Sequence, residues 1–191
     1  MPQTADAQFY QLYFQEPGVA EAEFERDPRA TLGAMLYGGS GEGAAAIRAN
    51  AERQGRTTGV GMVSRKDGLL PKVPVPLPSW LSSADLDYYG AEFASSGFRG
   101  PLNYYRNIDR NWELMGAFEG VKMVVPSLFI AGDHDMVMAF PGAAEHLANM
   151  KQFVPQLREI KMLPGCGHWT QQERPAEVNA AIIEFLRSVP N

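Results

Sequence analysis

Two side chains of this sequence, Asp135 and His168, have types that cooperate in acid–base chemistry and lie 168 − 135 = 33 residues apart. Each comes just after a stretch that is predicted to be a β-strand. Because the carboxyl ends of parallel strands gather catalytic side chains, the two residues are expected to meet. A carboxylate bonded to an imidazole holds its tautomer and stabilises the imidazolium that forms on protonation. The alternative makes Asp135 a turn residue and His168 a surface residue.

Residues near Asp135 and His168 raise two other possibilities, a metal site and a thiol nucleophile. Asp133 and His134 could join Asp135 and His168 as metal ligands. Adjacent side chains on a turn diverge, however, and no HxH or HExxH pattern supports them, so no metal site is expected. Cys166 lies two residues before His168 on a glycine-rich turn, which is poor geometry for a thiol nucleophile. We expect it to be a small buried filler.

The sequence lacks the motifs of several other enzyme classes. It has no G-x-S-x-G turn that would present a serine nucleophile. It has no G-x-G-x-x-G or Walker pattern after a strand, so nucleotide binding is unsupported and no cofactor is expected.

Two tyrosines are further candidates. Tyr10 lies in the aromatic segment 9–14 (FYQLYF), and Tyr105 lies on the apolar face of a predicted helix. Buried tyrosines usually pack the ring and find one partner for the hydroxyl. On these observations alone, both a structural and a functional role stay open.

The elements that would position these residues divide the chain near residue 120. From 16 to 116 we predict helices and loose loops with no convincing strand pair. The predicted helices are 19–26, a short one through Leu36, 44–54, one capped by Ser82 or Ser83 and ended by Gly97, and one from Pro101 to Met115. Residues 55–79, with four prolines, form a long irregular connection.

From 121 to 189 the chain alternates strand, helix, strand, helix. The predicted elements are a strand at 123–131, a helix at 141–150, a strand at 158–163 and a helix from Pro175. Parallel sheets need cover on both faces, and two strands with two helices cannot provide it. The sequence therefore predicts a part of a larger α/β fold.

Composition narrows the possible partners. The 191 residues carry 17 Lys and Arg against 22 Asp and Glu, a formal charge of −5, which disfavours nucleic acid and anionic membranes. The longest uncharged stretches, 30–41 and 73–84, are too short for a membrane span of about 20 apolar residues. No secretory signal is expected, and a single cysteine predicts a cytoplasmic protein.

Four segments together resemble the soluble epoxide hydrolases of the α/β-hydrolase superfamily. They are 10–18 (YQLYFQEPG), 96–107 (SGFRGPLNYYRN), 132–135 (GDHD) and 166–171 (CGHWTQ). Their order and spacing agree with that family over nearly the whole chain, and the first two are highly specific. The resemblance implies a partial α/β-hydrolase fold, with a helical cap and its leading segment at 1–118 and the C-terminal part of the core at 119–191.

The resemblance also implies the addition of water to a small-molecule epoxide through a covalent alkyl-enzyme ester. By motif match, Tyr10 and Tyr105 hydrogen-bond the ring oxygen. His168 activates the water that cleaves the ester, and Asp135 is its partner. Phenols polarise a leaving alkoxide, and covalent catalysis splits one hard step into two. Residues beside these matches are assigned to substrate binding: Phe9, Gln11 and Trp169.

One part of the family pattern is missing. The family's N-terminal lobe carries an HG oxyanion motif and an attacking Asp before Trp-Gly, and none of the three tryptophans here follows an aspartate. Asp6, the only acid before the cap, is on no predicted strand-to-helix turn. The chain is thus expected to be a C-terminal portion that is inactive alone. It would need the missing lobe or a companion chain, or would associate with its own copies.

Two other interpretations stay open. A haloalkane dehalogenase shares the fold and the ester chemistry, but it binds halide through Trp or Asn donors, and the paired tyrosine motifs favour an epoxide. A catalytically inactive module that binds another chain at an exposed sheet edge is the second alternative.

Overall fold

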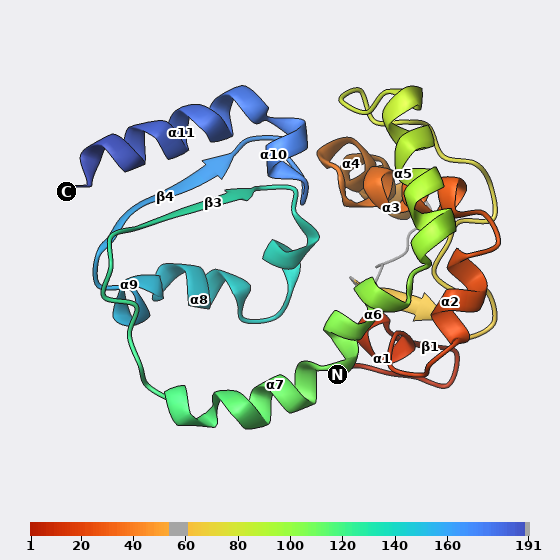
Figure 1. Cartoon of the computed structure of the whole chain (residues 1–191), viewed down its shortest axis with the longest axis horizontal. Coiled ribbons are helices and arrows are strands. Elements are labelled where there is room, and N and C mark those ends of the chain that lie inside the picture. The colour runs from red at the N-terminus through yellow and green to blue at the C-terminus, as the bar shows by residue number, and fades with distance from the viewer. Residues whose placement is uncertain (54–60, 190–191) are drawn as a thin grey trace. The chain divides into compact units, whose positions relative to one another are not determined.

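The computed structural model describes residues 1–53 and 61–189, without the side chain of Ala51. These residues form two compact units (Figure 1). The first unit comprises the described residues of 1–37 and 56–117, and the second those of 38–55 and 118–191. Most of the segment predicted as a helix at 44–54 therefore packs with the C-terminal part of the chain. The division into cap and core at 118/119 stays a prediction.

The first unit is mainly helical. Its elements are β1 (Ala7–Phe9), α1 (Tyr10–Tyr13), α2 (Val19–Phe24), α3 (Pro28–Gly39, whose last two residues belong to the second unit), β2 (Met62–Ser64), α5 (Ser83–Ser96), α6 (Arg99–Arg106), α7 (Ile108–Met115) and the 3-10 turn η1 (Gly116–Phe118, whose last residue belongs to the second unit). Two predicted helix ends are confirmed. Ser82 caps α5 by accepting a hydrogen bond from the Asp85 backbone N–H, and Gly97 ends that helix with a φ of 68°.

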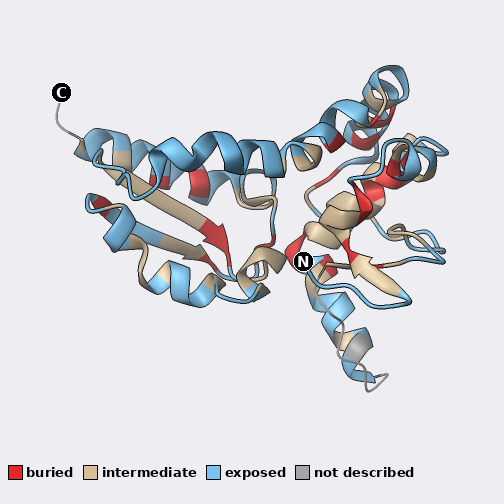
Figure 2. Cartoon of the chain, turned by 90° about the horizontal axis from the view of Figure 1, so that it is seen from below, coloured by how far each residue is buried: buried red, intermediate tan, exposed pale blue. Residues whose placement is uncertain are grey.

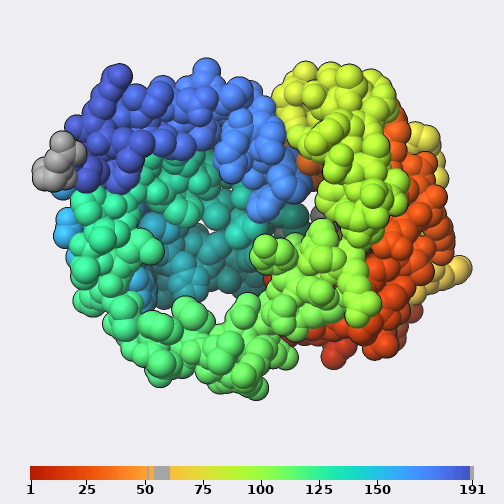
Figure 3. All heavy atoms as spheres, viewed as in Figure 1, coloured from red at the N-terminus to blue at the C-terminus, as the bar shows by residue number. Residues whose placement is uncertain are grey.

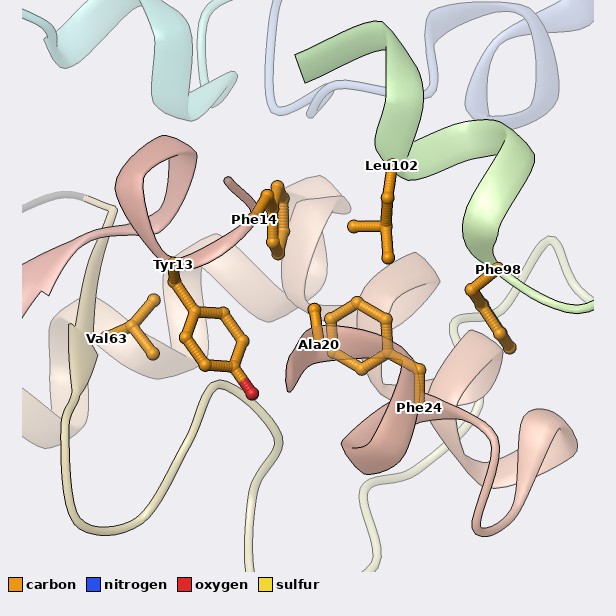
Figure 4. Packing of buried hydrophobic residues seen from close by; sticks show 7 residues of the cluster. All are labelled: Tyr13, Phe14, Ala20, Phe24, Val63, Phe98 and Leu102. Carbon is orange, nitrogen blue, oxygen red and sulfur yellow. The ribbon is translucent and has the colours of Figure 1, made fainter. Parts of the chain in front are cut away.

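An aromatic core holds the first unit together. Figure 4 shows Phe14 and Phe24, from the α1–α2 segment, meeting Phe98 and Leu102 from the α6 region. The rings of Phe14 and Phe24 lie 5.9 Å apart in an edge-to-face arrangement, and those of Phe24 and Phe98 lie 5.5 Å apart. Such pairs add to the stabilisation from burial alone.

Among the described residues of 16–116, where no strand pair is predicted, the structure has one named strand, β2, and its partner β1 precedes that region. β1 pairs with β2 in an antiparallel ladder that aligns Ala7 with Ser64 and Phe9 with Met62. Each strand has three residues, too few for a period-of-two pattern to show in the sequence. The part of the predicted 55–79 connection at 54–60 lies outside the described residues.

The single helix predicted from Pro101 to Met115 is also wrong, because the chain breaks into α6 and α7 at Asn107. Leu102 is buried, but Trp112 is 80% exposed. The two residues thus do not share one buried face, and the helical spacing in the sequence is interrupted by the break.

The second unit has α/β character. Its elements are α4 (Gly41–Arg53), β3 (Ser127–Gly132), the 3-10 turn η2 (Met136–Ala139), α8 (Ala143–Ala148), α9 (Met150–Phe153), β4 (Leu157–Leu163), α10 (Thr170–Glu173) and α11 (Pro175–Ser188). β3 and β4 pair in parallel, as predicted, with Phe129 opposite Ile160 and Gly132 opposite Leu163. The atoms of α10 and α11 form a continuous blue strip along one side of this unit in the space-filling view (Figure 3).

Helices lie on both faces of this short sheet. Ile130 packs in a cluster with Leu163 of β4 and Val178 of α11. The preceding residue, Phe129, lines a hollow together with Leu147 of α8. Successive side chains of a strand point to opposite faces, which explains this division.

β3 begins at Ser127, four residues later than the predicted strand at 123–131. Pro126 has no backbone N–H to donate to a ladder, so pairing starts after it. The carboxyl ends of β3 and β4 are buried, at Ala131, Gly132 and Leu163, whereas the middle of β4 is exposed (Figure 2). These ends lead into the loops that carry Asp135 and His168.

Across residues 1–53 and 61–189, no helix has the length and apolar character needed to cross a bilayer.

Candidate active site

The first group of candidate residues lies where β1 enters α1. Tyr10 opens α1, and its backbone N–H donates to the carbonyl of Gly61 at 2.8 Å. Its ring stands edge-on to the ring of Tyr105 from α6, with centroids 5.7 Å apart. The Phe14 ring contacts both, with its centroid 5.5 Å from that of Tyr10 and 4.8 Å from that of Tyr105. Two phenols that are 95 residues apart in the sequence thus share one aromatic wall.

The two phenols are in a half-buried environment. Burial is the main reason that the pKa of Tyr105 lies above its ordinary value, and the neighbouring Tyr10 raises it further. The amide nitrogen of Gln11 donates to the Tyr10 hydroxyl at 3.2 Å. A phenol oxygen that accepts a hydrogen bond keeps its own O–H as a donor. The raised pKa keeps Tyr105 protonated at neutral pH. Both hydroxyls can act as donors to an oxygen that gains negative charge.

Two nearby tyrosines differ from this pair. The hydroxyl of Tyr13 donates to the Glu23 carboxylate at 2.5 Å, and burial together with this bond raises the Tyr13 pKa well above its ordinary value. The proton of that hydroxyl is already used in the bond to Glu23. Tyr104, next to Tyr105, is 83% exposed. It provides a matched neighbour outside the aromatic wall.

An ion pair fixes α6 to α2, and a backbone contact fixes it to the end of α1. The Arg106 guanidinium binds both Glu21 carboxylate oxygens, at 2.8 and 2.9 Å, and its Nε donates to the Phe14 carbonyl at 3.0 Å. The hydrogen bond from Arg106 is the main reason that the Glu21 pKa falls to about 2. The Gln15 amide adds a bond to the Tyr105 carbonyl at 3.0 Å. These contacts hold Tyr105 in place beside Tyr10.

The second group lies in the loops after β3 and β4. Asp135 caps η2, where its Oδ1 accepts from the Val137 backbone N–H at 2.9 Å. Its Oδ2 lies 3.0 Å from Nδ1 of His168. The Asp135 side chain is 11% exposed and the His168 side chain 45%. The carboxylate is therefore sheltered while the imidazole stays open to solvent.

The electrostatics of this pair favour the charged forms. Burial raises the Asp135 pKa, but the bonds from His168 and Val137 outweigh it, so the pKa lies below its ordinary value. The Asp135 hydrogen bond raises the His168 pKa, and burial opposes it in part. With Nδ1–H donating to Asp135, Nε2 of His168 carries the lone pair that can accept a proton.

Close backbone packing places the His168 loop. The His168 backbone N–H donates to the Gly39 carbonyl at 2.7 Å. A Cβ on Gly41 would lie 2.0 Å from the Gly165 carbonyl oxygen, and one on Gly167 would lie 2.3 Å from the Gly39 oxygen. Only glycine allows such approaches without displacing the backbone. The segment before α4 and the loop after β4 are thus in direct backbone contact.

Asp133 and His134 have other partners than the Asp135–His168 pair. Asp133 Oδ1 accepts from the Gly165 N–H at 2.7 Å, and His134 Nδ1 lies 3.3 Å from the Gly41 carbonyl. Within the part of the chain that the structure describes, no group of three or more His, Cys, Asp or Glu residues is arranged to hold a metal ion.

Cys166 is fully buried, and burial is the main cause that raises the pKa of its thiol to about 11. The thiol is therefore protonated at neutral pH and is not an activated nucleophile.

The residues assigned to substrate binding differ in their surroundings. Phe9 is buried with its ring 4.6 Å from that of Tyr10. Gln11 bonds the Tyr10 hydroxyl, as described above. Trp169 is half-buried, its ring 4.9 Å from the His168 imidazole and its indole beside Gly39. All three adjoin a candidate reactive group, and their contact with substrate stays a prediction.

Sequence reasoning missed three charged residues that support these groups: Glu21, Arg106 and Glu173. The Glu21–Arg106 pair joins positions 85 residues apart, which no local pattern reveals. One signal was present, since Glu21 is three residues after Gly18, the spacing of a capping box, and its side chain accepts from the Gly18 N–H. Glu173 is in a helix of four residues, α10, that was not predicted.

The comparisons with known proteins point in one direction. No family model matches the chain. The chain is 43% identical over 185 residues to Epoxide hydrolase A of Mycobacterium tuberculosis, and the matched region covers 93% of this chain and 52% of that protein. It is 38% identical over 187 residues to Epoxide hydrolase 1 of Siraitia grosvenorii, and that match covers 94% of this chain and 52% of the relative.

A solved structure agrees with these relatives. An epoxide hydrolase from an endophytic Streptomyces superposes with a TM-score of 0.83 at 39% identity, covering 96% of this chain and 53% of that one. The chain therefore has part of the α/β-hydrolase fold of the epoxide hydrolases. It spans about half the length of the curated relatives named above.

Proposed function

We propose that this chain is a C-terminal portion of an epoxide hydrolase, which adds water to an epoxide to form a vicinal diol. It would supply the residues for opening the ring and for hydrolysing the ester, while the attacking carboxylate comes from polypeptide beyond this sequence. The observation that carries the proposal is the meeting of the Tyr10 and Tyr105 rings at 5.7 Å, in a chain similar to epoxide hydrolases along nearly its whole length.

In the first step, a carboxylate oxygen attacks one epoxide carbon. The bond from that carbon to the ring oxygen breaks, and its electron pair goes to the oxygen. Tyr10 and Tyr105 donate hydrogen bonds to this oxygen, and one phenol gives up its proton to form the hydroxyl. Donors placed where charge develops stabilise a transition state strongly in a water-poor site. The apolar surroundings of Tyr105 support this role.

In the second step, Nε2 of His168 takes a proton from water, and the resulting hydroxide attacks the ester carbonyl carbon. The tetrahedral intermediate collapses and the ester C–O bond breaks. The leaving alkoxide takes the proton of the new carboxyl group, so the diol leaves and the attacking carboxylate is restored. The imidazolium gives its proton to solvent and the phenolate takes one from solvent, which restores both groups. The Asp135 carboxylate at 3.0 Å stabilises the imidazolium between these events.

A companion lobe belongs to this proposal. The β3–β4 sheet is two-stranded in the described part of the chain, so each strand has one edge without a paired strand there. Apolar side chains are exposed in the second unit, such as Val124 at 63%, Phe153 at 56% and Leu186 at 62%. The occupant we propose is the half of an epoxide hydrolase that this chain does not match. Self-association of the chain is the competing occupant.

The decisive experiment joins this chain to the part of Mycobacterium tuberculosis Epoxide hydrolase A that it does not cover. The fusion should convert styrene oxide to its diol, whereas the pure 191-residue protein should not. A folded, monomeric fusion that forms no diol contradicts the proposal. Turnover by the 191-residue protein alone would show that the attacking carboxylate is already in this sequence.

We also propose a cytoplasmic location and, within the fold, a cap at 1–118 and a core portion at 119–191. The support for the location is the single cysteine, Cys166, which is a buried free thiol. The support for the division is the resemblance of the segments 10–18 and 96–107 to the cap of the family.

A further inference from the structure

Glu173, at the end of α10, has a carboxylate that gathers backbone N–H groups from two separate segments. Its Oε2 accepts from Gly41 at 2.9 Å and from Gly167 at 3.0 Å. Its Oε1 accepts from Gly167 at 3.1 Å and from Trp169 at 3.2 Å. Three amides thus converge on one side chain, two of them from the residues on either side of His168.

These amides lie at the start of α4 and on both sides of His168. Gly41 is the first residue of α4, where backbone N–H groups have no partner within the helix. A carboxylate there satisfies one of them and interacts favourably with the helix dipole. Gly167 and Trp169 flank the imidazole-bearing residue. Glu173 therefore joins the start of α4 to the loop that carries His168.

The remaining contacts of this loop converge on the same segment. The His168 N–H donates to the Gly39 carbonyl at 2.7 Å, two residues before Gly41. A Cβ on Gly39 would lie 2.7 Å from Nε1 of Trp169. Because all these contacts are between backbone groups or close to them, a small displacement of the loop would break several at once.

We propose that Glu173 is a positioning residue for the water-activating histidine. It acts by tying the backbone on both sides of His168 to the start of α4, which holds the imidazole at hydrogen-bonding distance from Asp135. This role deepens the proposed function, on which its catalytic meaning rests. The geometric claim concerns the 191-residue protein itself and can be tested without activity.

Charge gives Glu173 a second effect on the same histidine. Two carboxylates act on the His168 imidazole: Asp135 from the loop after β3 and Glu173 from α10. The Asp135 hydrogen bond is the largest cause that raises the His168 pKa, and the charge of Glu173 adds to it. Removal of the Glu173 charge should therefore lower the His168 pKa, both directly and through a weakened bond to Asp135.

The test is the substitution Glu173→Gln in the full chain, followed by NMR titration of the histidine ring protons. The sequence has three histidines, so His168→Gln assigns the signal. We expect the His168 midpoint to fall in Glu173→Gln. Amide exchange at Gly167 and Trp169 should also accelerate by about tenfold or more.

Glu177→Gln is the matched control. Glu177 lies four residues further along, is 53% exposed and pairs with Arg174 at 3.5 Å. We expect it to leave the His168 midpoint and both amides unchanged. A folded Glu173→Gln protein with an unchanged midpoint and unchanged amide exchange overturns the proposal, even if its melting temperature falls, because Glu173 would then be only a stabilising residue.

Two further measurements apply if Glu173→Gln does not fold. In the unsubstituted protein, the amides of Gly41, Gly167 and Trp169 should exchange slowly, and fast exchange at all three contradicts the proposed contacts. Glu173→Asp keeps the charge but shortens the side chain. It should therefore speed the exchange of these amides while the His168 midpoint stays closer to that of the unsubstituted protein than in Glu173→Gln. The reverse pattern would also contradict the positioning role.

Discussion

The two units hold their candidate reactive groups by different means. In the first unit, Tyr10 and Tyr105 are positioned by aromatic contacts and by the ion pair between Glu21 and Arg106. In the second, His168 is positioned mainly by backbone hydrogen bonds and glycine contacts around its loop, with Asp135 as the side-chain partner. Side-chain packing tolerates small shifts better than backbone-to-backbone contact does. The position of His168 therefore depends more closely on the chain segments that pack against its loop.

The cores of the units show the same difference. The first unit buries a cluster of seven residues that includes Phe14, Phe24 and Phe98. The second buries a smaller cluster of Leu163, Cys166 and Val178. Because buried apolar area is the main source of stability, the first unit gains more stabilisation from its own buried residues than the second does. The candidate residues of the first unit therefore lie beside a larger buried cluster than those of the second.

The largest expected effect comes from His168→Gln in the fusion with the half that this chain does not match. Ester formation should proceed while water activation fails, with turnover lowered by roughly 10²–10⁴-fold. Mass spectrometry should show the protein with one substrate covalently attached. Asp135→Asn should give a milder form of the same defect, since the imidazole is misoriented rather than absent. Unchanged multiple turnover in His168→Gln would rule out the proposed role.

The next effect tests the first unit. Tyr105→Phe should slow ester formation by about 2–4 kcal/mol of transition-state stabilisation, and Tyr10→Phe should behave similarly. Pre-steady-state kinetics with styrene oxide measures this step. Tyr104→Phe is the control and should be nearly silent, since Tyr104 is 83% exposed. Equal effects at Tyr104 and Tyr105 would mean that the wrong hydroxyl was chosen. No effect at either Tyr10 or Tyr105 would favour the dehalogenase interpretation instead.

The ion pair behind Tyr105 predicts a pH-dependent stability. The Glu21 pKa of about 2 in the folded protein lies below its ordinary 4.5. A depressed carboxyl pKa stabilises the folded state fully above the ordinary value, and this is lost as pH falls from about 4.5 toward about 2. Glu21→Gln should therefore cost on the order of 2 kcal/mol at pH 7, after allowance for solvent screening, and progressively less below pH 4.5.

Urea unfolding at several pH values measures the Glu21 effect. Glu113→Gln removes an exposed pair with Arg110 in the same unit and should change stability by less than about 0.5 kcal/mol. A loss in Glu21→Gln that is the same at pH 7 and pH 3 would show that packing, not charge, accounts for it.

The smallest effect on stability is expected at the exposed surface of the second unit. Leu186→Ser, at a side chain 62% exposed, should change the unfolding free energy of the 191-residue protein by less than about 0.5 kcal/mol and reduce its self-association. Leu163→Ala, at a residue 1% exposed, should cost about 2–5 kcal/mol. Analytical ultracentrifugation and urea unfolding check both. A large loss of stability in Leu186→Ser would mean that this surface is already covered.

Local patterns in the sequence predicted much of the secondary structure and the pairing of Asp135 with His168. Ser82 and Gly97 act within one turn of the helix that they delimit, so their effect is visible in neighbouring residues. β3 could be recognised as an apolar run followed by a glycine turn. A glycine turn also follows β4, although residues 158–160 of that strand are exposed. The order of the two strands along the chain placed Asp135 and His168 at the same end of the sheet, where the structure has them 3.0 Å apart.

Only the tertiary structure decided which distant groups compensate one another. β1 and β2 are too short to show a pattern and are stabilised by pairing across more than 50 residues. Arg106 meets Glu21 from 85 positions away, and Glu173 accepts from Gly41 across 132. Such partners depend on which charges and backbone amides remain unpaired once the helices have packed. Periodicity and capping signals describe a residue's own element, and they carry no information about the other chain segment that will lie against it.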